Sequence, residues 1–260
     1  MTFADPAATH RVRAEWGLTS QGQLPSTHRY VELVRTPDGT EAVLKLGPPG
    51  DPEHEQELDA LEWFAGRGGV RVLAVDRARG AALLERLKPG TQLRTLVPRS
   101  DAQATTIAAS VMRSLWRAPP AEHRFPHVLD WGAALTGRPA ALFAEFAGNM
   151  GEPVVLHGDL HHENILRSGD DWVAIDPAGV IAEREYETGA LLRNPYPELL
   201  ELPQPGRMLA RRAAQLADEL ELDHRRIRTW AWAQAHLAAA WTVEEGEDPA
   251  YWLACADLLA

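Results

Sequence analysis

The segment from His157 to Leu166 constrains the fold of this chain more than any other stretch. It reads HGDLHHENIL and follows an apolar run, Val154 to Leu156, of the kind that forms a short buried strand. Asp159 and Asn164 are five residues apart in this segment, so a tight loop after the strand can direct a carboxylate and an amide into one cleft. Twelve residues after Asn164, Asp176 ends the next short apolar run. The spacing predicts that three oxygen-bearing side chains serve one site.

The same segment fits the H-x-D-L-x-x-x-x-N pattern of a kinase catalytic loop. In that interpretation Asp159 accepts or orients the proton of a substrate hydroxyl, which is the catalytic role. Asn164 and Asp176 are hard oxygen ligands suited to Mg²⁺ held on the phosphates of ATP. Pro177 replaces the aromatic residue of a D-F-G sequence, but the position of Asp176 still fits a metal ligand.

Two other interpretations of this segment are open. The loop could be an ordinary turn in which the histidines are incidental. Alternatively, the imidazoles and carboxylates could form the transition-metal site of a hydrolase, which would need further ligands from elsewhere in the chain. The sequence shows no second cluster of comparable density, and five matched positions followed by a spaced aspartate favour phosphoryl transfer. The residues of the hydrolase alternative are His157, Asp159, His161, His162 and Asp176.

The first third of the chain is expected to alternate strands with one helix. Residues 29–34 alternate polar and apolar side chains, and residues 36–40 carry turn chemistry before a second strand at 42–46. Apolar spacing predicts a helix over 53–67, and two further strands are expected at 70–75 and 81–87. Lys88-Pro89-Gly90 is the best candidate for a hinge between two lobes.

The remainder is expected to be mostly helical. Ser100 followed by Gln103 suggests a capping box, and the apolar residues after it recur at helical spacing. The segments 207–220 and 223–241 are expected to form long helices, and Asp248 before Pro249 is expected to start the last one. The fold class is therefore α+β, with residues 1–87 as an N-terminal nucleotide-binding lobe built on a small antiparallel sheet. Residues 88–260 form a mostly helical lobe with the catalytic loop and the substrate pocket.

Composition restricts the partners. The formal net charge is −11 and the isoelectric point is near 5.4, so the surface repels phosphate backbones and argues against nucleic acid as a partner. Such a surface attracts cationic small molecules, although an acidic balance also simply keeps a protein soluble. Cys255 is the only cysteine, so no intrachain disulfide can form. We find no signal-peptide run and no membrane-length apolar stretch, which predicts no membrane association and a cytoplasmic location.

Three segments together resemble the aminoglycoside/hydroxyurea phosphotransferase family, whose best-known members are streptomycin 6-kinases. They are the catalytic segment from Val155, the segment Trp172–Gly179 and the leucine-arginine-asparagine-proline segment that ends at Pro195. The strands at 42–46 and 83–87 and the tryptophan-containing helix at 230–241 match as well, so the resemblance covers most of the chain. It implies a two-lobed protein-kinase-like fold and ATP-dependent transfer of phosphate to an alcohol group of an antibiotic.

The resemblance also implies roles on the nucleotide side. Lys45 matches the strand lysine that binds the α and β phosphates, and Glu57 matches its helix partner, with Glu53 and Glu55 as competitors from the sequence alone. The backbone from Glu85 to Leu87 would bind adenine, and Ser26 is a candidate for the cover over the phosphates.

The sequence departs from the family pattern at four places. It has no G-x-G-x-x-G loop, and Leu24-Pro25-Ser26-Thr27-His28 occupies the place of the phosphate-covering turn. Glu163 replaces a residue that is usually glycine, and Glu187 stands where an aspartate usually braces the catalytic loop. The segment 119–152, which would help to form the substrate pocket, is short for the family.

Aminoglycosides are polycations, so the resemblance implies carboxylates in the acceptor pocket. The acidic run after the tryptophan-containing helix supplies candidates in Glu244, Glu245 and Asp248, although a solvated loop between helices would have the same composition. Two further functions remain open: a metabolic kinase for a sugar, amino sugar or other hydroxylated amine, and a non-catalytic nucleotide-binding pseudokinase. The intact set of Lys45, Asp159, Asn164 and Asp176 argues against the pseudokinase.

Overall fold

The computed structural model describes residues 6–26 and 29–260, and the chain divides into two compact units. The first unit contains the residues up to Gly90 together with Arg167–Ala178, and the second contains Thr91–Leu166 and Gly179–Ala260. The chain therefore passes from one unit to the other three times. Asp176 belongs to the first unit, whereas the loop that carries Asp159 belongs to the second.

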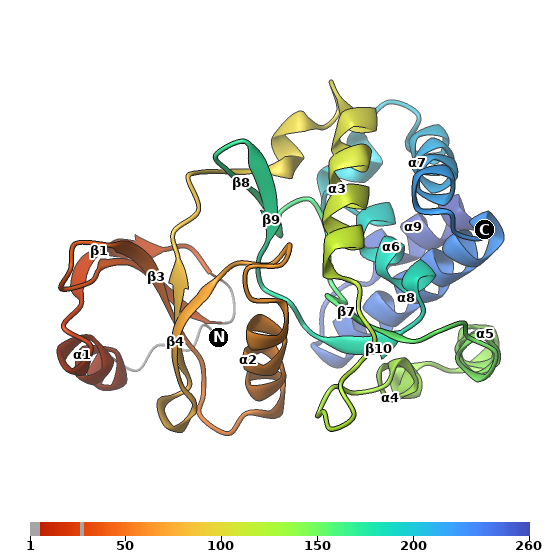
Figure 1. The fold of residues 1–260 in the computed structure, drawn as a ribbon. Coiled ribbons are helices and arrows are strands. Elements are labelled where there is room, and N and C mark those ends of the chain that lie inside the picture. The colour runs from red at the N-terminus through yellow and green to blue at the C-terminus, as the bar shows by residue number, and fades with distance from the viewer. Residues whose placement is uncertain (1–5, 27–28) are drawn as a thin grey trace. The chain divides into compact units, whose positions relative to one another are not determined.

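The first unit is built on a five-stranded antiparallel sheet (Figure 1). The strand order is β1-β2-β3-β5-β4, and β2 and β3 form a hairpin whose turn contains Gly39 at a positive φ of 88°. Strand β1 was not anticipated from the sequence, because its residues are almost all polar and exposed. The strands are β1 Thr19–Leu24, β2 Tyr30–Arg35, β3 Glu41–Leu46, β4 Val72–Asp76 and β5 Ala81–Glu85.

Alternation along β3 assigns its side chains to two faces. Ala42, Leu44 and Leu46 are fully buried in a cluster that also contains Val12 of helix α1 (Pro6–Glu15). Lys45 lies between two of these residues in sequence, so its side chain points to the opposite face, where it meets helix α2 (Pro52–Phe64).

Helix α2 begins and ends where the sequence signals predict, within three residues. The carboxylate of Asp51 accepts a hydrogen bond from the backbone N–H of His54 at 2.9 Å, and Pro52 occupies the first turn. Gly66, at a positive φ of 69°, follows the end of the helix. The apolar side of α2 buries Leu58 and Leu61.

A three-stranded sheet, in the order β6-β8-β9, contains two of the points where the chain changes units. At the end of β9, the backbone of Ala174 donates to Gly68 at 2.7 Å and accepts from Val70 at 2.9 Å, which fixes the segment leading to Asp176 within the first unit. The strands are β6 Pro89–Gln92, β8 Ile165–Ser168 and β9 Asp171–Ala174.

The second unit is mostly helical, as expected. A short antiparallel pair, β7 (Val154–Leu156) with β10 (Val180–Ala182), lies at the start of the catalytic loop, with Leu156 opposite Val180. The core of the second unit includes Phe143, Tyr186 and Trp230, whose rings meet edge to face with centroids 5.0–6.1 Å apart. The α-helices are α3 Asp101–Leu115, α4 Val128–Trp131, α5 Gly137–Gly148, α6 Arg184–Leu192, α7 Pro205–Leu220, α8 His224–Glu244 and α9 Ala250–Leu259.

Short 3₁₀ helices complete the fold, and the start of α3 differs from the sequence-based expectation. Ser100 occupies the N-cap of α3, but its side chain makes no capping hydrogen bond, so the expected capping box with Gln103 was wrong. Within the described residues, no helix is both long and apolar enough to cross a bilayer. The 3₁₀ helices are η1 Arg77–Arg79, η2 Leu93–Leu96, η3 Gly132–Ala134 and η4 Glu198–Glu201.

Candidate active site

The predicted site residues form one group in each unit. In the first unit, the ammonium of Lys45 on β3 lies 2.7 Å from Oδ1 of Asp176 and forms an ion pair with Glu57 of α2. The structure thus chooses between the glutamates that the sequence left open, since Glu55 pairs with Arg77 at 3.0 Å instead. Lys45, Glu57 and Asp176 are therefore brought together by β3, α2 and the segment after β9.

Burial and charge decide the protonation of Lys45 and Glu57. Burial on its own would lower the pKa of Lys45, but the attraction of Asp176 and Glu57 outweighs it, so the pKa lies above its ordinary value. For Glu57, burial is opposed by the Lys45 charge and by His54, and the pKa lies below its ordinary value. Both groups are charged at neutral pH, and a buried lysine of this kind is a fixed cation suited to phosphate oxygens.

Asp176 is held in an unusual backbone conformation. Its φ is +56°, a left-handed value that costs a non-glycine residue free energy and is found mostly where surrounding contacts impose it. The segment after it is tied to α2, because Nε2 of Gln56 donates to the carbonyl of Ala178 at 2.8 Å. The carboxylate of Asp176 is half exposed, so one oxygen can contact Lys45 while the group remains accessible to a ligand.

In the second unit, the catalytic loop turns directly after β7. Gly158 has a positive φ of 85°, and a Cβ there would come within 2.6 Å of the Trp131 ring, so only glycine fits this position. The Glu187 carboxylate on α6 accepts hydrogen bonds from the backbone N–H groups of His157 at 2.8 Å and Gly158 at 3.0 Å. Glu187 thus braces the catalytic loop at the position where the family pattern usually has an aspartate. Burial raises the pKa of Glu187 to about 7.

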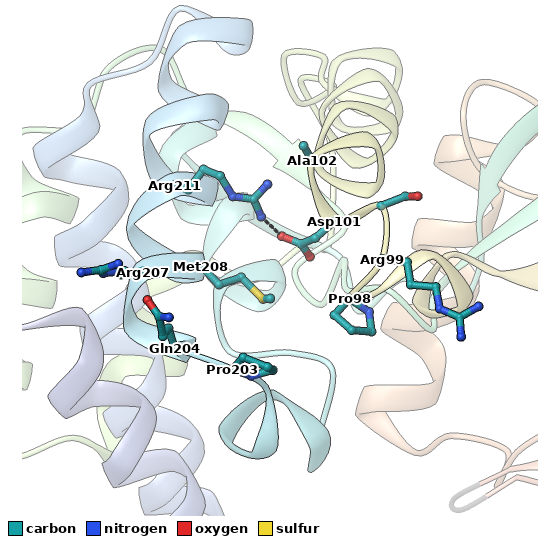
Figure 2. Close-up of a pocket in the computed structure, with 10 residues that line it drawn as sticks. Pro98, Arg99, Asp101, Ala102, Pro203, Gln204, Arg207, Met208 and Arg211 are labelled. Carbon is teal, nitrogen blue, oxygen red and sulfur yellow. Dashed lines mark hydrogen bonds and ion pairs between the residues drawn. The ribbon is translucent and has the colours of Figure 1, made fainter.

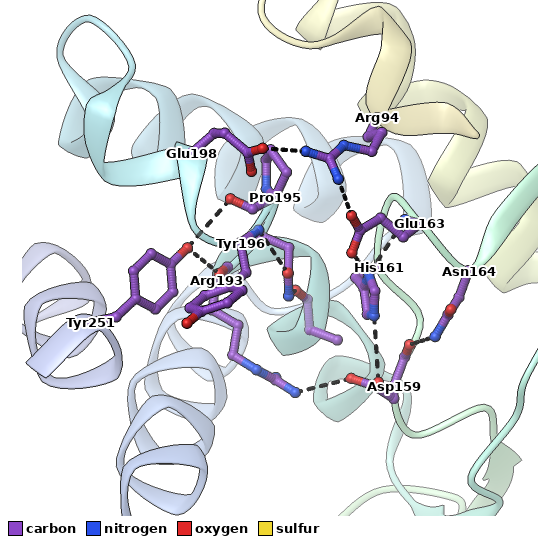
Figure 3. Close-up of polar contacts among 12 residues, drawn as sticks. Arg94, Asp159, His161, Glu163, Asn164, Arg193, Pro195, Tyr196, Glu198 and Tyr251 are labelled. Atoms are coloured by element: carbon purple, nitrogen blue, oxygen red, sulfur yellow. Dashed lines mark hydrogen bonds and ion pairs between the residues drawn. The ribbon is translucent and has the colours of Figure 1, made fainter. Parts of the chain in front are cut away.

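Asp159 follows this turn with its carboxylate about half exposed. Nη2 of Arg193 donates to Oδ1 at 3.2 Å, and Nε2 of His161 lies 3.5 Å from Oδ2 (Figure 3). Desolvation alone would raise the pKa of Asp159, but His161 and Arg193 outweigh it and hold the pKa well below its usual range. The carboxylate is therefore ionised and can accept a hydrogen bond from a hydroxyl.

Asn164 closes the loop onto Asp159. Its Nδ2 donates to the backbone carbonyl of Asp159 at 3.0 Å, and its own N–H donates to the carbonyl of His161 at 3.0 Å. The side-chain nitrogen of Asn164 is therefore used in the hydrogen bond to the loop backbone. Its side-chain oxygen takes no part in that bond, and oxygen is the atom type that Mg²⁺ prefers. The amide oxygen of Asn164 and the carboxylate of Asp176 are each a donor type that Mg²⁺ accepts.

The unusual Glu163 has a clear structural partner. Its carboxylate pairs with Arg94 of η2, and the same guanidinium pairs with Glu198 of η4 (Figure 3). The backbone N–H of Arg94 also donates to the carbonyl of His162 at 3.2 Å. Glu163 therefore fastens the catalytic loop to η2 by an ion-pair network.

Arg193 is a site residue to which the sequence analysis gave no role. It lies just after α6 with its side chain about nine-tenths buried, and its second Nη atom donates to Oε1 of Gln234 on α8 at 2.7 Å. Gln234 in turn donates to the carbonyl of Tyr186 at 2.5 Å. The resemblance included this arginine in its leucine-arginine-asparagine-proline segment, and that was the one available signal.

The transition-metal alternative finds no support. In residues 6–26 and 29–260, no three His, Cys, Asp or Glu side chains come together as metal ligands. His162 is fully buried, and burial followed by the charge of Arg212 lowers its pKa well below the ordinary value, so it is a neutral core residue.

The other predicted nucleotide-side residues end or follow strands of the first sheet. Glu85 ends β5, and its carboxylate accepts from the backbone N–H of Arg71 at 2.8 Å. Leu87 is buried and Ser26 is exposed just after β1. Thr27 and His28, the remainder of the expected phosphate-covering turn, lie outside the described residues.

The predicted acceptor carboxylates lie between α8 and α9. Glu244 is the last residue of α8, Glu245 is its C-cap, and both are exposed. Asp248 is also exposed, and its Oδ1 accepts from the N–H of Ala250 at 2.9 Å where α9 begins, as the sequence predicts.

A separate hollow of about 460 Å³ lies where α3 and α7 begin (Figure 2). Its central carboxylate, Asp101, pairs with Arg211 and with the fully buried Arg212. Arg212 also donates to the carbonyls of Leu191 at 3.0 Å and Asn194 at 2.6 Å. This ion-pair cluster holds the end of α6, and none of the predicted site residues lines the hollow.

Residues 15–246 match the family described as aminoglycoside/hydroxyurea antibiotic resistance kinase. The chain belongs to this family. Among curated relatives, a streptomycin 3''-kinase of Klebsiella pneumoniae is 33% identical, with 89% of this chain and 91% of that protein covered. A streptomycin 6-kinase of Streptomyces glaucescens is 28% identical, with 94% and 86% covered.

Solved structures agree with the kinase-like fold. The choline kinase LicA from Streptococcus pneumoniae superimposes on this kinase with a TM-score of 0.70 at 16% identity, covering 97% of each chain. A macrolide 2'-phosphotransferase from Brachybacterium faecium gives a TM-score of 0.60, also at 16% identity and 97% coverage of each chain. At these identities the likeness shows the fold alone, and the family and fold expectations are both confirmed.

Proposed function

We propose that this kinase transfers the γ-phosphate of ATP to a hydroxyl of a streptomycin-like aminoglycoside. The observation that carries the proposal is the ionised, half-exposed carboxylate of Asp159 on a loop braced by Glu187 and closed by Asn164. Relatives that cover most of this chain are streptomycin kinases, which supports the acceptor class.

Asp159 is proposed as the catalytic residue. Its carboxylate accepts a hydrogen bond from the acceptor hydroxyl and orients it toward the phosphate. Because the pKa of Asp159 lies below its usual range, the group is a weak base, and it orients the hydroxyl more than it deprotonates it early. That suits phosphoryl transfer, in which positioning and charge stabilisation do most of the work.

The first unit supplies the nucleotide contacts in this proposal, with residues 1–87 as the nucleotide-binding lobe and 88–260 as the helical lobe. Lys45, kept charged by Glu57, binds the phosphates, while the backbone between Glu85 and Leu87 binds adenine and Ser26 covers the phosphates. The ion pair between Lys45 and Glu57 supports this role, because it holds the ammonium in place before nucleotide binds.

Asn164 and Asp176 are proposed as the magnesium ligands. Mg²⁺, when bound, neutralises charge on the phosphate oxygens during transfer. Asn164 offers its side-chain oxygen and is held by its hydrogen bond to the Asp159 carbonyl. Asp176 offers its half-exposed carboxylate and is held by Lys45, with Gln56 bonded to Ala178 just after it.

The acceptor is proposed to be a cationic small molecule, and Glu244, Glu245 and Asp248 are proposed to attract it. Their exposure and the net charge of −11 support this role. Neither nucleic acid nor a membrane has a place in this function, and we propose a cytoplasmic location.

An ATP-consumption assay with purified protein tests the function. Streptomycin should support turnover, and NMR of the product should locate the phosphate, since the relatives include both a 3''-kinase and 6-kinases. Asp159→Asn should remove turnover while the thermal unfolding curve stays close to that of wild type. Near wild-type phosphorylation by Asp159→Asn would overturn the catalytic assignment.

Hydroxyurea is a second candidate acceptor, because a hydroxyurea phosphotransferase of Kitasatospora aureofaciens is 33% identical over 89% of this chain and 71% of that protein. The same assay with hydroxyurea and with simple amino sugars separates these acceptors by kcat/KM. ATP binding without turnover on any acceptor would instead indicate a pseudokinase.

A further inference from the structure

Three aromatic residues gather where α9 begins and where the chain leaves α6. Tyr196 stacks on Trp252 with ring centroids 5.2 Å apart and an interplanar angle of 16°. Tyr251 meets both rings edge to face, at 4.7 Å from Tyr196 and 4.8 Å from Trp252. We call Tyr196, Tyr251 and Trp252 the aromatic cluster.

The aromatic cluster is not part of the hydrophobic core. Tyr196 is 49% exposed, and Tyr251 and Trp252 are half-buried, whereas the core aromatics Tyr186 and Trp230 are almost completely buried. Exposed aromatic rings that pack on one another mark binding surfaces more often than single exposed apolar residues do. Because ring contacts already restrain Tyr196, a ligand that stacks on it would lose little additional side-chain entropy.

The cluster is joined to Asp159 through one residue. The hydroxyl of Tyr251 donates to the backbone carbonyl of Arg193 at 2.9 Å, with the carbonyl of Pro195 at 3.4 Å from the same oxygen. The guanidinium of Arg193 reaches the Asp159 carboxylate, so Tyr251 and Asp159 contact the same arginine, one at its backbone carbonyl and the other at the end of its side chain (Figure 3).

Carboxylates flank the aromatic cluster in sequence on both sides. Exposed carboxylates precede it at Glu244, Glu245, Glu247 and Asp248, within seven residues of Tyr251. Glu198 and Glu201 of η4 follow Tyr196. Glu198 forms an ion pair with Arg94. Arg193, the cation beside the cluster, is already paired with Asp159. Aromatic faces near exposed carboxylates attract a ring that carries positive charge.

We propose that the aromatic cluster is an acceptor subsite that binds a sugar or cyclitol ring bearing ammonium or guanidinium groups. Stacking on Tyr196 and Trp252 would hold this ring, while a hydroxyl on a neighbouring ring of the same molecule faces Asp159. This inference rests on the proposed function, because it says where the ring of the acceptor that is not phosphorylated binds.

Three variants of one residue test the subsite, with streptomycin as the probe. Tyr196→Ala removes the ring, Tyr196→Leu keeps apolar volume without an aromatic face, and Tyr196→Phe keeps the ring without its hydroxyl. We expect Tyr196→Ala and Tyr196→Leu to raise the KM for streptomycin by about 5- to 30-fold, with the KM for ATP unchanged. Tyr196→Phe should stay within about twofold of wild type.

Leu253→Ala is the matched control, because Leu253 is an exposed apolar residue next to Trp252 on α9 that offers no aromatic face. It should leave both KM values unchanged. Thermal unfolding of each variant shows that a higher KM does not come from lost structure. An unchanged streptomycin KM in Tyr196→Ala, or an equal rise in the ATP KM, would overturn the subsite.

Calorimetric binding of streptomycin separates this inference from the proposed function. Tyr196-dependent binding without phosphorylation would reject the function and support the subsite. Turnover by wild type with a streptomycin KM that does not depend on Tyr196 would support the function and reject the subsite. If wild type binds no streptomycin, the subsite is rejected as well.

Discussion

Arg193 donates a hydrogen bond across 3.2 Å to Oδ1 of Asp159, and the same guanidinium donates across 2.7 Å to Gln234. The Arg193 side chain is about nine-tenths buried, so its orientation is set by α8 and not by solvent. One oxygen of Asp159 is thereby held, and the carboxylate plane that receives the acceptor hydroxyl is fixed. Arg193 is a positioning residue in this arrangement.

Replacing Arg193 should therefore impair turnover more than nucleotide binding. We expect Arg193→Ala to lower kcat by roughly 10- to 100-fold with little change in the KM for ATP, because a misplaced carboxylate affects the reacting geometry. Arg193→Lys should recover part of the loss, and added guanidinium ion should partly rescue Arg193→Ala. A loss that neither lysine nor guanidinium reduces would indicate a merely structural role.

The Lys45–Glu57 pair should determine nucleotide affinity. Lys45→Met should raise the KM for ATP by roughly 10-fold or more and lower kcat, because the phosphates lose their fixed cation. Glu57→Gln should have a smaller effect in the same direction, since Asp176 still contacts the ammonium. Glu55→Gln is the control, because Glu55 lies on the same helix α2 but pairs with Arg77 of η1 and not with Lys45. Equal effects of Glu57→Gln and Glu55→Gln would contradict the pairing.

Magnesium dependence should distinguish the two proposed ligands from nearby carboxylates. Asn164→Ala and Asp176→Asn should each raise the Mg²⁺ concentration needed for half-maximal rate by about 10-fold or more, and EDTA should stop turnover by wild type. Asp170→Asn should behave as wild type, because Asp170 is fully exposed in the turn between β8 and β9. A wild-type magnesium titration for Asp176→Asn would remove that residue from the metal site.

Glu187 should give the folded state a measurable pH dependence. Burial raises its pKa from 4.5 to about 7, so between these values the folded state binds a proton that the unfolded state does not. Stability from this group is complete below the unfolded pKa and is lost as pH rises through about 7, by about 3 kcal/mol in all. The difference in unfolding free energy between wild type and Glu187→Gln should therefore shrink from about pH 5 to pH 8. Urea denaturation at several pH values measures it, and a flat or rising difference would refute the assignment.

The acidic segment after α8 should act on the acceptor through long-range charge. The double variant Glu244→Gln with Glu245→Gln should raise the KM for streptomycin about 3- to 10-fold at low salt, and high salt should reduce this difference. Asp218→Asn, an exposed change on α7, is the charge control. If salt alters the KM values for ATP and streptomycin equally in wild type, the acidic segment has no role in acceptor binding.

Features encoded within a few residues could be predicted from the sequence. The loop from His157 to Asn164 is one: Gly158 permits its turn, and Asn164 bonds back to Asp159 only five residues away. The strand at 42–46 and the helix expected from residue 53 also follow from local patterns, and the structure has β3 at Glu41–Leu46 and α2 at Pro52–Phe64. Strand β1 escaped prediction because an exposed edge strand has no apolar pattern to reveal it.

Only the tertiary structure could decide which distant side chains meet. Arg193 reaches Asp159 from 34 residues away, and Arg94 reaches Glu163 from 69 residues away. Glu57 became the partner of Lys45, rather than Glu55, through the rotation of α2 against β3. The sequence around a charged residue does not reveal its ion-pair partner, because the pairing depends on how separate elements of the fold pack together. Sequence therefore determined the chemistry of the catalytic loop, and packing decided how that chemistry is held in place.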